Sequence, residues 1–179
     1  MSFADIRRDY SGEPLSETAS DPDPYAQFAR WFAQIRDLEA DPTAFALATA
    51  TRDGKPSVRT VLLKDVDERG FVFYTNHEGR KGRELLAHPQ AALCFHWQPL
   101  EEQVRVEGDA APVADDEADA YFASRPRGSQ IGAWASLQSR PIEREGDLER
   151  RYAEIERRAA LDDIALGGRV DAPSAFDRP

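Results

Sequence analysis

The chain has 179 residues, 41% of them hydrophobic, and a formal net charge of −10. These values are typical of a soluble globular protein with a core of its own, and the acidic balance argues against nucleic-acid binding, which needs a basic face. No apolar run approaches the length of a membrane helix (about 20 residues), and the first residues lack the apolar core of a secretion signal, so we expect a cytoplasmic protein without membrane contact.

The composition divides the chain into three parts. Residues 1–21 mix charges with glycine, proline and a run of Ser, Thr and Asp, which predicts a mobile N-terminal segment. Residues 22–160 carry the periodic apolar positions of one folded domain. Residues 161–179 contain Gly167-Gly168, two prolines and no periodicity, which predicts a disordered tail.

A helix is predicted over residues 25–40, and Asp41-Pro42 should end it because the residue before a proline avoids the helical conformation. Its apolar side chains recur at helical spacing and are Phe28, Trp31, Phe32, Ile35 and Leu38. This stripe predicts a helix that packs one face on the core.

The sequence pattern after residue 44 is typical of short strands joined by tight turns. Arg52–Lys55 and Asp67–Gly70 have the composition of hairpin turns. The strands are predicted at residues 45–51, 58–64, 71–75, 91–97 and 103–108, with a helix at about 78–87. This pattern predicts a mainly β domain with flanking helices, built as an antiparallel barrel or sandwich.

Three more helices are predicted, at residues 115–124, 129–135 and 143–161. Asp115 and Asp116 are placed to cap the first of them. Tyr121 and Arg125 are four positions apart, so both should lie on one face of that helix, which suits a single ligand. A helix-surface pair without function is the alternative interpretation.

Basic residues stand out in the middle of this acidic chain, namely Arg59, Lys64, Arg80, Lys81 and Arg83. Basic groups at strand ends and at a helix start suit a phosphate-bearing cofactor, and ordinary surface charge on a strand edge is the alternative. Arg59 and Lys64 would face opposite sides of a regular strand. Both can reach one ligand only if the strand bulges or if Lys64 lies at its end. The three histidines show no metal-ligand spacing, so no metal site is predicted.

Nine motifs in this order make the chain resemble the pyridoxamine 5′-phosphate oxidase family. They are Arg8–Tyr10, Asp41–Ala44, Arg59–Lys64, Phe73–Asn76, Arg80-Lys81, Leu100–Val104, Tyr121–Arg127, Ser129–Trp134 and Gln138-Ser139. The resemblance covers residues 1 to about 160. It implies an FMN-binding split β-barrel that forms a homodimer with FMN at the interface.

The resemblance also implies site residues. Those implied for FMN are Arg59, Thr60, Val61, Leu62, Leu63, Lys64, Tyr74, Thr75, Arg80, Lys81, Gln103, Gln138 and Ser139. Those implied for the substrate are Lys64, Tyr121, Arg125 and Ser129, with Arg7 and Tyr10 in an N-terminal segment that closes over it. No residue is assigned a catalytic role.

The implied activity is oxidation of pyridoxamine 5′-phosphate or pyridoxine 5′-phosphate to pyridoxal 5′-phosphate, with O₂ reduced to H₂O₂. Family members continue with a Trp-Gly-Gly motif and an Arg-x-His-Asp-Arg segment, and residues 161–179 match neither. We therefore expect a truncated or frameshifted oxidase. One alternative is a non-catalytic or impaired protein that binds FMN or pyridoxal phosphate on the same fold. Two others are an oxidase in which another segment replaces the missing one, and a split-barrel flavoprotein that acts on another substrate.

Overall fold

The computed structural model describes residues 1–7, 9–12 and 14–160. Its fold is α+β, an antiparallel sheet with flanking helices, which confirms the predicted fold class. The described chain forms two compact units: unit 1 comprises residues 1–48, 56–73 and 91–108, and unit 2 comprises residues 49–55, 74–90 and the chain from residue 109. The tail predicted at residues 161–179 lies outside the described residues, and the boundaries predicted at residues 21 and 160 stay predictions.

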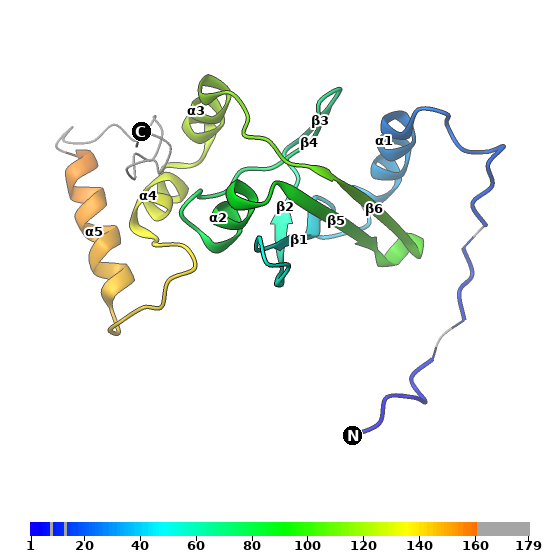
Figure 1. The fold of residues 1–179 in the computed structure, drawn as a ribbon, viewed down its shortest axis with the longest axis horizontal. Helices are drawn as coiled ribbons and strands as arrows, with labels where there is room; N and C mark the ends of the chain where they lie inside the picture. Colours follow the sequence, from blue (N-terminus) through cyan, green and yellow to red (C-terminus); the bar gives the residue numbers. More distant parts are fainter. Residues whose placement is uncertain (8, 13, 161–179) are drawn as a thin grey trace. The chain divides into compact units, whose positions relative to one another are not determined.

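Most of a four-stranded sheet belongs to unit 1, with the strand order β2-β1-β5-β6 (Figure 1). The strands are β1 (Ala44–Ala50), β2 (Pro56–Leu62), β5 (Gln90–Trp97) and β6 (Glu102–Asp109), with a 3-10 turn, η1 (Gln98–Leu100), before β6. Gly54, at φ +84°, sits in the predicted turn between β1 and β2, where a left-handed backbone favours glycine. Four of the five predicted strands are confirmed to within a few residues.

The predicted third strand, residues 71–75, is only partly correct. The chain forms a small hairpin instead, in which β3 (Asp65–Asp67) pairs antiparallel with β4 (Gly70–Val72). Because β2 ends at Leu62, Lys64 lies beyond the end of that strand, and its backbone N–H donates to the Val72 carbonyl at 2.9 Å. Of the two arrangements left open for Lys64, the structure therefore shows the strand-end position.

The helix predicted at residues 25–40 is α1 (Pro24–Ile35). The Asp23 carboxylate accepts a hydrogen bond from the Tyr25 N–H, so a side chain caps the N-terminus directly before Pro24. The helix ends earlier than predicted. Ile35 is fully buried, but Leu38 follows the last helical turn and is 60% exposed, so it does not belong to the apolar stripe.

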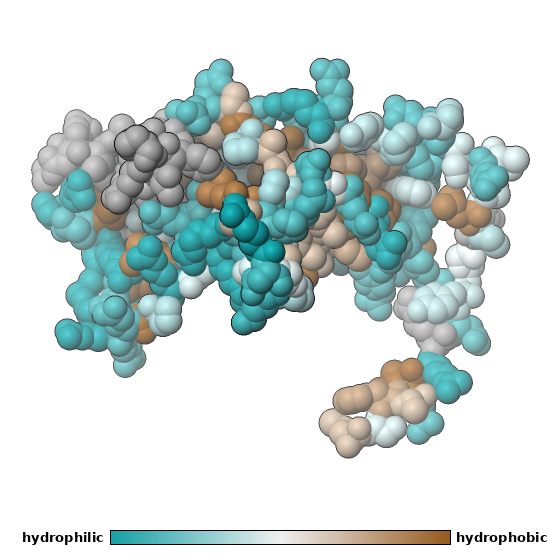
Figure 2. Space-filling view, in the orientation of Figure 1, coloured by the Kyte–Doolittle hydropathy of each residue, from teal (hydrophilic) through white to brown (hydrophobic). Residues whose placement is uncertain are grey.

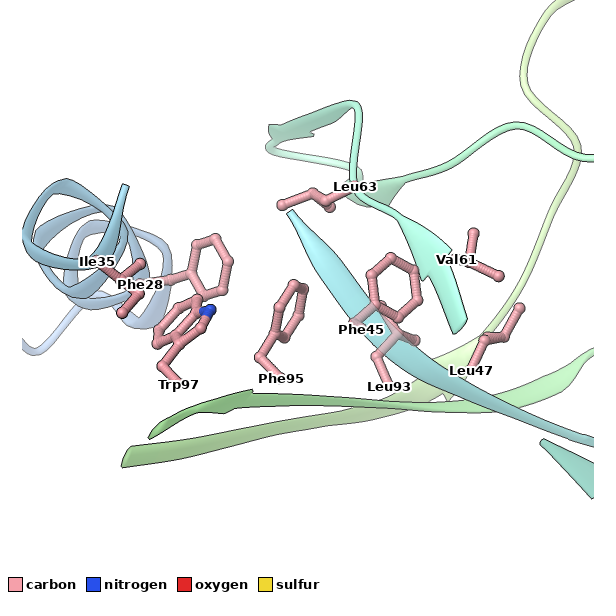
Figure 3. Packing of buried hydrophobic residues seen from close by; sticks show 9 residues of the cluster. All are labelled: Phe28, Ile35, Phe45, Leu47, Val61, Leu63, Leu93, Phe95 and Trp97. Atoms are coloured by element: carbon pink, nitrogen blue, oxygen red, sulfur yellow. The ribbon is translucent and has the colours of Figure 1, made fainter. Parts of the chain in front are cut away.

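Aromatic rings fill the core of unit 1 between α1 and the sheet (Figure 3). Phe95 is fully buried, and its ring lies 5.2 Å from that of Phe28 and 5.1 Å from that of Phe45. Trp97 is 1% exposed and donates its indole N–H to the Pro42 carbonyl at 3.2 Å. The remaining members of the cluster are Ile35, Leu47, Val61, Leu63 and Leu93. Burial of these side chains is the main stabilising contribution to unit 1.

The described part of unit 2 holds four further helices, which are α2 (Arg80–Ala87), α3 (Asp115–Ser124), α4 (Arg127–Ala135) and α5 (Asp147–Ala160). All four predicted helices exist, and α4 packs against α5 (Figure 1). The last begins later than the predicted residue 143 because Gly146 has φ +81°, outside the helical region. At α3 the N-cap residue is Ala114, so Asp115 and Asp116 lie inside the first turn and neither is the N-cap residue. The Asp116 carboxylate still accepts a hydrogen bond from the Glu117 N–H of that turn at 3.0 Å.

Hydrophilic residues dominate the face shown in Figure 2, in line with the strong net charge. None of the helices in the described ranges is both long enough and apolar enough to cross a membrane.

Candidate functional site

The N-terminus of α2 carries positive charge where a helix ordinarily favours negative charge. Gly79 is its N-cap residue, Arg80 and Lys81 are its first two residues, and its first turn has no acidic residue. The first turns of α3 and α5, in contrast, contain Asp115 and Asp147. A helix N-terminus has a partial positive charge, so adjacent cations destabilise it unless an anion lies close by. A helix start of this kind suits an anionic ligand.

A glutamine from a distant segment lies against this helix start. The Gln138 Oε1 atom accepts hydrogen bonds from Lys81 Nζ at 2.8 Å and from Thr75 Oγ1 at 3.2 Å. The turn that carries Gln138 is held by an Arg140 N–H to Leu137 carbonyl bond of 3.0 Å. Unit 2 thus brings together three residues implied for FMN: a cation, a hydroxyl and an amide.

Arg80 has a buried partner one turn along its own helix. Its Nε–H donates to Glu84 Oε1 at 2.8 Å, and Thr49 Oγ1 donates to Glu84 Oε2 at 2.5 Å. Glu84 is 5% exposed and Thr49 is 3% exposed. Sequence reasoning missed both residues. The four-residue spacing of Arg80 and Glu84 was the available signal for the ion pair, whereas nothing in the sequence signalled Thr49.

Two tyrosines implied for different ligands stack on each other. The rings of Tyr74 and Tyr121 are 3.8 Å apart and nearly parallel, with an interplanar angle of 5°. Tyr74 also donates its hydroxyl to Glu117 Oε1 at 3.3 Å. Glu117 was not foreseen, because one acid among several at the start of a helix carries no distinguishing pattern.

Arg125 does not share a helix face with Tyr121, so that prediction is wrong. The α3 helix ends at Ser124, and Arg125 adopts an extended conformation with φ −71° and ψ 147°. The cause is Pro126, which disfavours the helical conformation of the residue before it. The Arg125 guanidinium lies 5.5 Å from the centroid of the Phe122 ring. Ser129 lies in the first turn of α4 and is exposed.

The other implied residues lie at several places. The side chains of Val61 and Leu63 are buried in the core of unit 1, so only their backbone atoms remain for a ligand, whereas Thr60 and Leu62 are exposed. Arg59 donates to the Leu47 carbonyl at 3.1 Å and to the Ser57 hydroxyl. The remaining implied residues are exposed and are Lys64, Gln103, Ser139, Arg7 and Tyr10. The ligand roles of all these residues stay predictions.

Other atoms lie close to Gly79 and Gly82 at the start of α2 and leave little space for a Cβ atom at either position. A Cβ atom on Gly79 would lie 2.5 Å from Gln138 Oε1, at the end of a flexible side chain, whereas one on Gly82 would lie 2.4 Å from the His77 carbonyl oxygen. We expect Gly82→Ala to lower the free energy of unfolding by about 1–3 kcal/mol, because the backbone must shift. Gly79→Ala should lower it by less than Gly82→Ala does, because the Gln138 side chain can move and the nearest backbone atom, the Asn76 carbonyl oxygen, lies 3.2 Å away. Urea unfolding measures both.

Gly132→Ala is the control for these variants, because the Cβ would meet nothing within 4 Å in the interior of α4. It should stabilise the protein by about 0.5–1 kcal/mol. Equal losses for Gly79→Ala and Gly82→Ala would show that the close approach to the His77 backbone is not what requires glycine.

Comparison with known proteins identifies what this arrangement resembles. The sequence pattern of the pyridoxamine 5′-phosphate oxidase family matches residues 32–159. A pyridoxine/pyridoxamine 5′-phosphate oxidase from Rubrobacter xylanophilus is 60% identical over 157 residues, which cover 87% of this chain and 72% of that protein. A protein of the same name from Myxococcus xanthus is 61% identical over 140 residues, or 78% of this chain and 68% of the relative.

Solved structures give the same result for the fold. PhzG from Burkholderia lata 383, in complex with tetrahydrophenazine-1-carboxylic acid, matches with a TM-score of 0.77 and 31% identity over 87% of this chain and 77% of that chain. A pyridoxamine 5′-phosphate oxidase-related, FMN-binding protein from Nostoc punctiforme has a TM-score of 0.58 at 20% identity, over 72% of each chain, which is a likeness of fold alone.

Proposed function

Because the chain belongs to the pyridoxamine 5′-phosphate oxidase family, we propose that it oxidises pyridoxamine 5′-phosphate and pyridoxine 5′-phosphate to pyridoxal 5′-phosphate with FMN as cofactor. Family membership makes it an oxidoreductase of vitamin B6 metabolism with a flavin cofactor. The choice of FMN, the use of O₂ as electron acceptor, the homodimer and the cytoplasmic location are parts of the proposal.

The observation that carries the proposal is the cationic start of α2. Arg80 and Lys81 stand at a helix N-terminus that has no acidic residue in its first turn. A phosphate dianion is the group that such a cluster favours, because helix amides, guanidinium and ammonium all donate hydrogen bonds to it. The donor set therefore fits the phosphate of FMN. Lys81 would leave the Gln138 oxygen or share it when the phosphate binds.

The remaining residues of unit 2 would orient ligands rather than react with them. Thr75 and Gln138 offer a hydroxyl and an amide beside the cation, which suits the polar parts of a flavin nucleotide. Tyr121 and Ser129 offer hydroxyls, and Arg125 offers a guanidinium, for the phosphate of the substrate. When bound, FMN supplies the redox chemistry by accepting two electrons from the 4′ carbon of the substrate and passing them to O₂.

The net reactions balance without a further cofactor. Pyridoxine 5′-phosphate and O₂ give pyridoxal 5′-phosphate and H₂O₂. Pyridoxamine 5′-phosphate, O₂ and water give pyridoxal 5′-phosphate, ammonia and H₂O₂. Positioning the 4′ carbon against the flavin is then the main task of the protein, and orientation alone contributes much of the rate in such reactions.

The test is an oxidase assay on the purified protein after reconstitution with FMN. We expect pyridoxal 5′-phosphate and H₂O₂ to form in equal amounts from pyridoxamine 5′-phosphate, and unphosphorylated pyridoxamine to react far more slowly. FMN-loaded protein that forms no product would contradict the proposal and would support a binding protein instead. Protein that does not retain FMN would contradict both.

A further inference from the structure

We propose that Glu84 is a positioning residue that holds the Arg80 guanidinium ready for the phosphate of FMN. This inference rests on the proposed function, because it assigns Arg80 to that phosphate. Glu84 belongs to none of the residue sets that sequence motifs indicate for cofactor or substrate. Its place one turn after Arg80, and its burial, are the observations that single it out.

The Glu84 carboxylate is held at both oxygens. Oε1 accepts from Arg80 Nε at 2.8 Å, and Oε2 accepts from Thr49 Oγ1 at 2.5 Å. Thr49 comes from β1, so the carboxylate joins a strand to the first turn of α2. A carboxylate with 5% exposure loses most of its hydration, and these two bonds offset that cost. Because both oxygens are occupied, the carboxylate cannot turn away from Arg80 without losing a bond.

The geometry of the ion pair leaves Arg80 able to bind a ligand. Glu84 accepts a hydrogen bond from the Nε–H, and a guanidinium has five N–H donors. The Arg80 side chain is 50% exposed, so part of it remains accessible to a ligand while the Nε–H is held by Glu84. A pre-ordered arginine loses less conformational freedom when an anion binds, and immobilising one such side chain costs about 2- to 12-fold in affinity.

Charge alone predicts the opposite effect of Glu84. A carboxylate beside an anion site repels the anion, so neutralising Glu84 should strengthen FMN binding if only charge matters. Glu84→Gln and Glu84→Met separate the two effects. Both variants remove the charge, but glutamine keeps an oxygen that accepts from Arg80 Nε and an amide that can bond to the Thr49 hydroxyl. Methionine keeps the length and removes both bonds.

The experiment measures the dissociation constants of FMN and riboflavin for each variant. The apoprotein is titrated with each flavin, and flavin fluorescence monitors the binding. Riboflavin lacks the phosphate and so reports on everything except the anion site. We expect Glu84→Met to weaken FMN binding by about 5- to 10-fold and to leave riboflavin binding within twofold. Glu84→Gln should bind FMN at least as tightly as the wild type.

The matched control is Glu154→Met, which breaks an exposed ion pair on α5. In this pair the Arg157 Nη2 and Glu154 Oε1 atoms are 2.8 Å apart. It should change neither constant. If Glu84→Met does not yield folded protein, Thr49→Val removes one of the two bonds and should shift FMN affinity in the same direction by a smaller factor.

Three results would overturn the inference about Glu84: equal effects of the Gln and Met variants on FMN, equal losses of FMN and riboflavin, or no effect of Glu84→Met. Each of these presumes that the wild-type protein prefers FMN to riboflavin. A wild-type protein without that preference would refute the assignment of the phosphate to α2, and the role of Glu84 would fall with it.

Discussion

Lys81→Met should weaken FMN binding by about 10- to 100-fold, because one charge-assisted hydrogen bond to a phosphate contributes about 1.5–3 kcal/mol. Lys81 lies in the first turn of α2 and is half-buried, with its ammonium 2.8 Å from Gln138 Oε1. Methionine keeps most of the length of the side chain and removes only the charge and its donors. Titration of the apoprotein with FMN measures the effect.

Lys55→Met is the matched control. Lys55 belongs to the same unit but lies exposed in the turn between β1 and β2. The substitution removes the same charge from the protein, so it reports any general effect of a more negative chain. Equal weakening by the two variants, or equal weakening of FMN and riboflavin by Lys81→Met, would show that Lys81 does not bind the phosphate.

Phe95→Ala should lower the free energy of unfolding by about 3–5 kcal/mol, the largest stability effect that we expect from a single substitution. Phe95 is fully buried in the middle of β5, and rings surround it at centroid distances of 5.2 Å (Phe28), 5.1 Å (Phe45) and 5.6 Å (Trp97). Alanine would leave a cavity that this rigid aromatic cluster fills poorly. Urea unfolding, monitored by tryptophan fluorescence, measures the change in the free energy of unfolding.

Phe3→Ala is the control for this prediction, since Phe3 is 64% exposed and should contribute less than about 0.5 kcal/mol. A similar small loss for Phe95→Ala would mean that the cluster around β5 is not the centre of the hydrophobic core. Proteins typically have a free energy of unfolding of about 5–15 kcal/mol, so the loss expected for Phe95→Ala is a large share of the total.

The periodic spacing of apolar residues predicted most helices and strands well, because the residues that repeat along an element are those that it buries. Phe45 and Leu47 alternate along β1 and both are buried, as the pattern indicates. The helix stripe of α1 is correct as far as Ile35 and wrong at Leu38, because a single apolar residue after a helix end looks the same in sequence as one more turn. The β3–β4 hairpin was missed because strands of three residues carry no usable period.

The candidate site was harder to predict from the residues. Family motifs named Lys81 and Gln138, and the structure brings the two side chains within hydrogen-bond distance. Spacing alone placed Arg125 on the same helix face as Tyr121, but Pro126 ends the helix before it. Glu84 is the clearest omission. Its importance comes from burial and from Thr49, a residue 35 positions away, and neither is visible in the local sequence.

The paired titration of the wild-type apoprotein with FMN and riboflavin, at low and at high salt, tests the central claim most directly. If the start of α2 holds the phosphate, FMN should bind at least about 100-fold more tightly than riboflavin, and only the FMN constant should weaken as salt rises. Equal constants for the two flavins, or equal salt dependence, would contradict the claim.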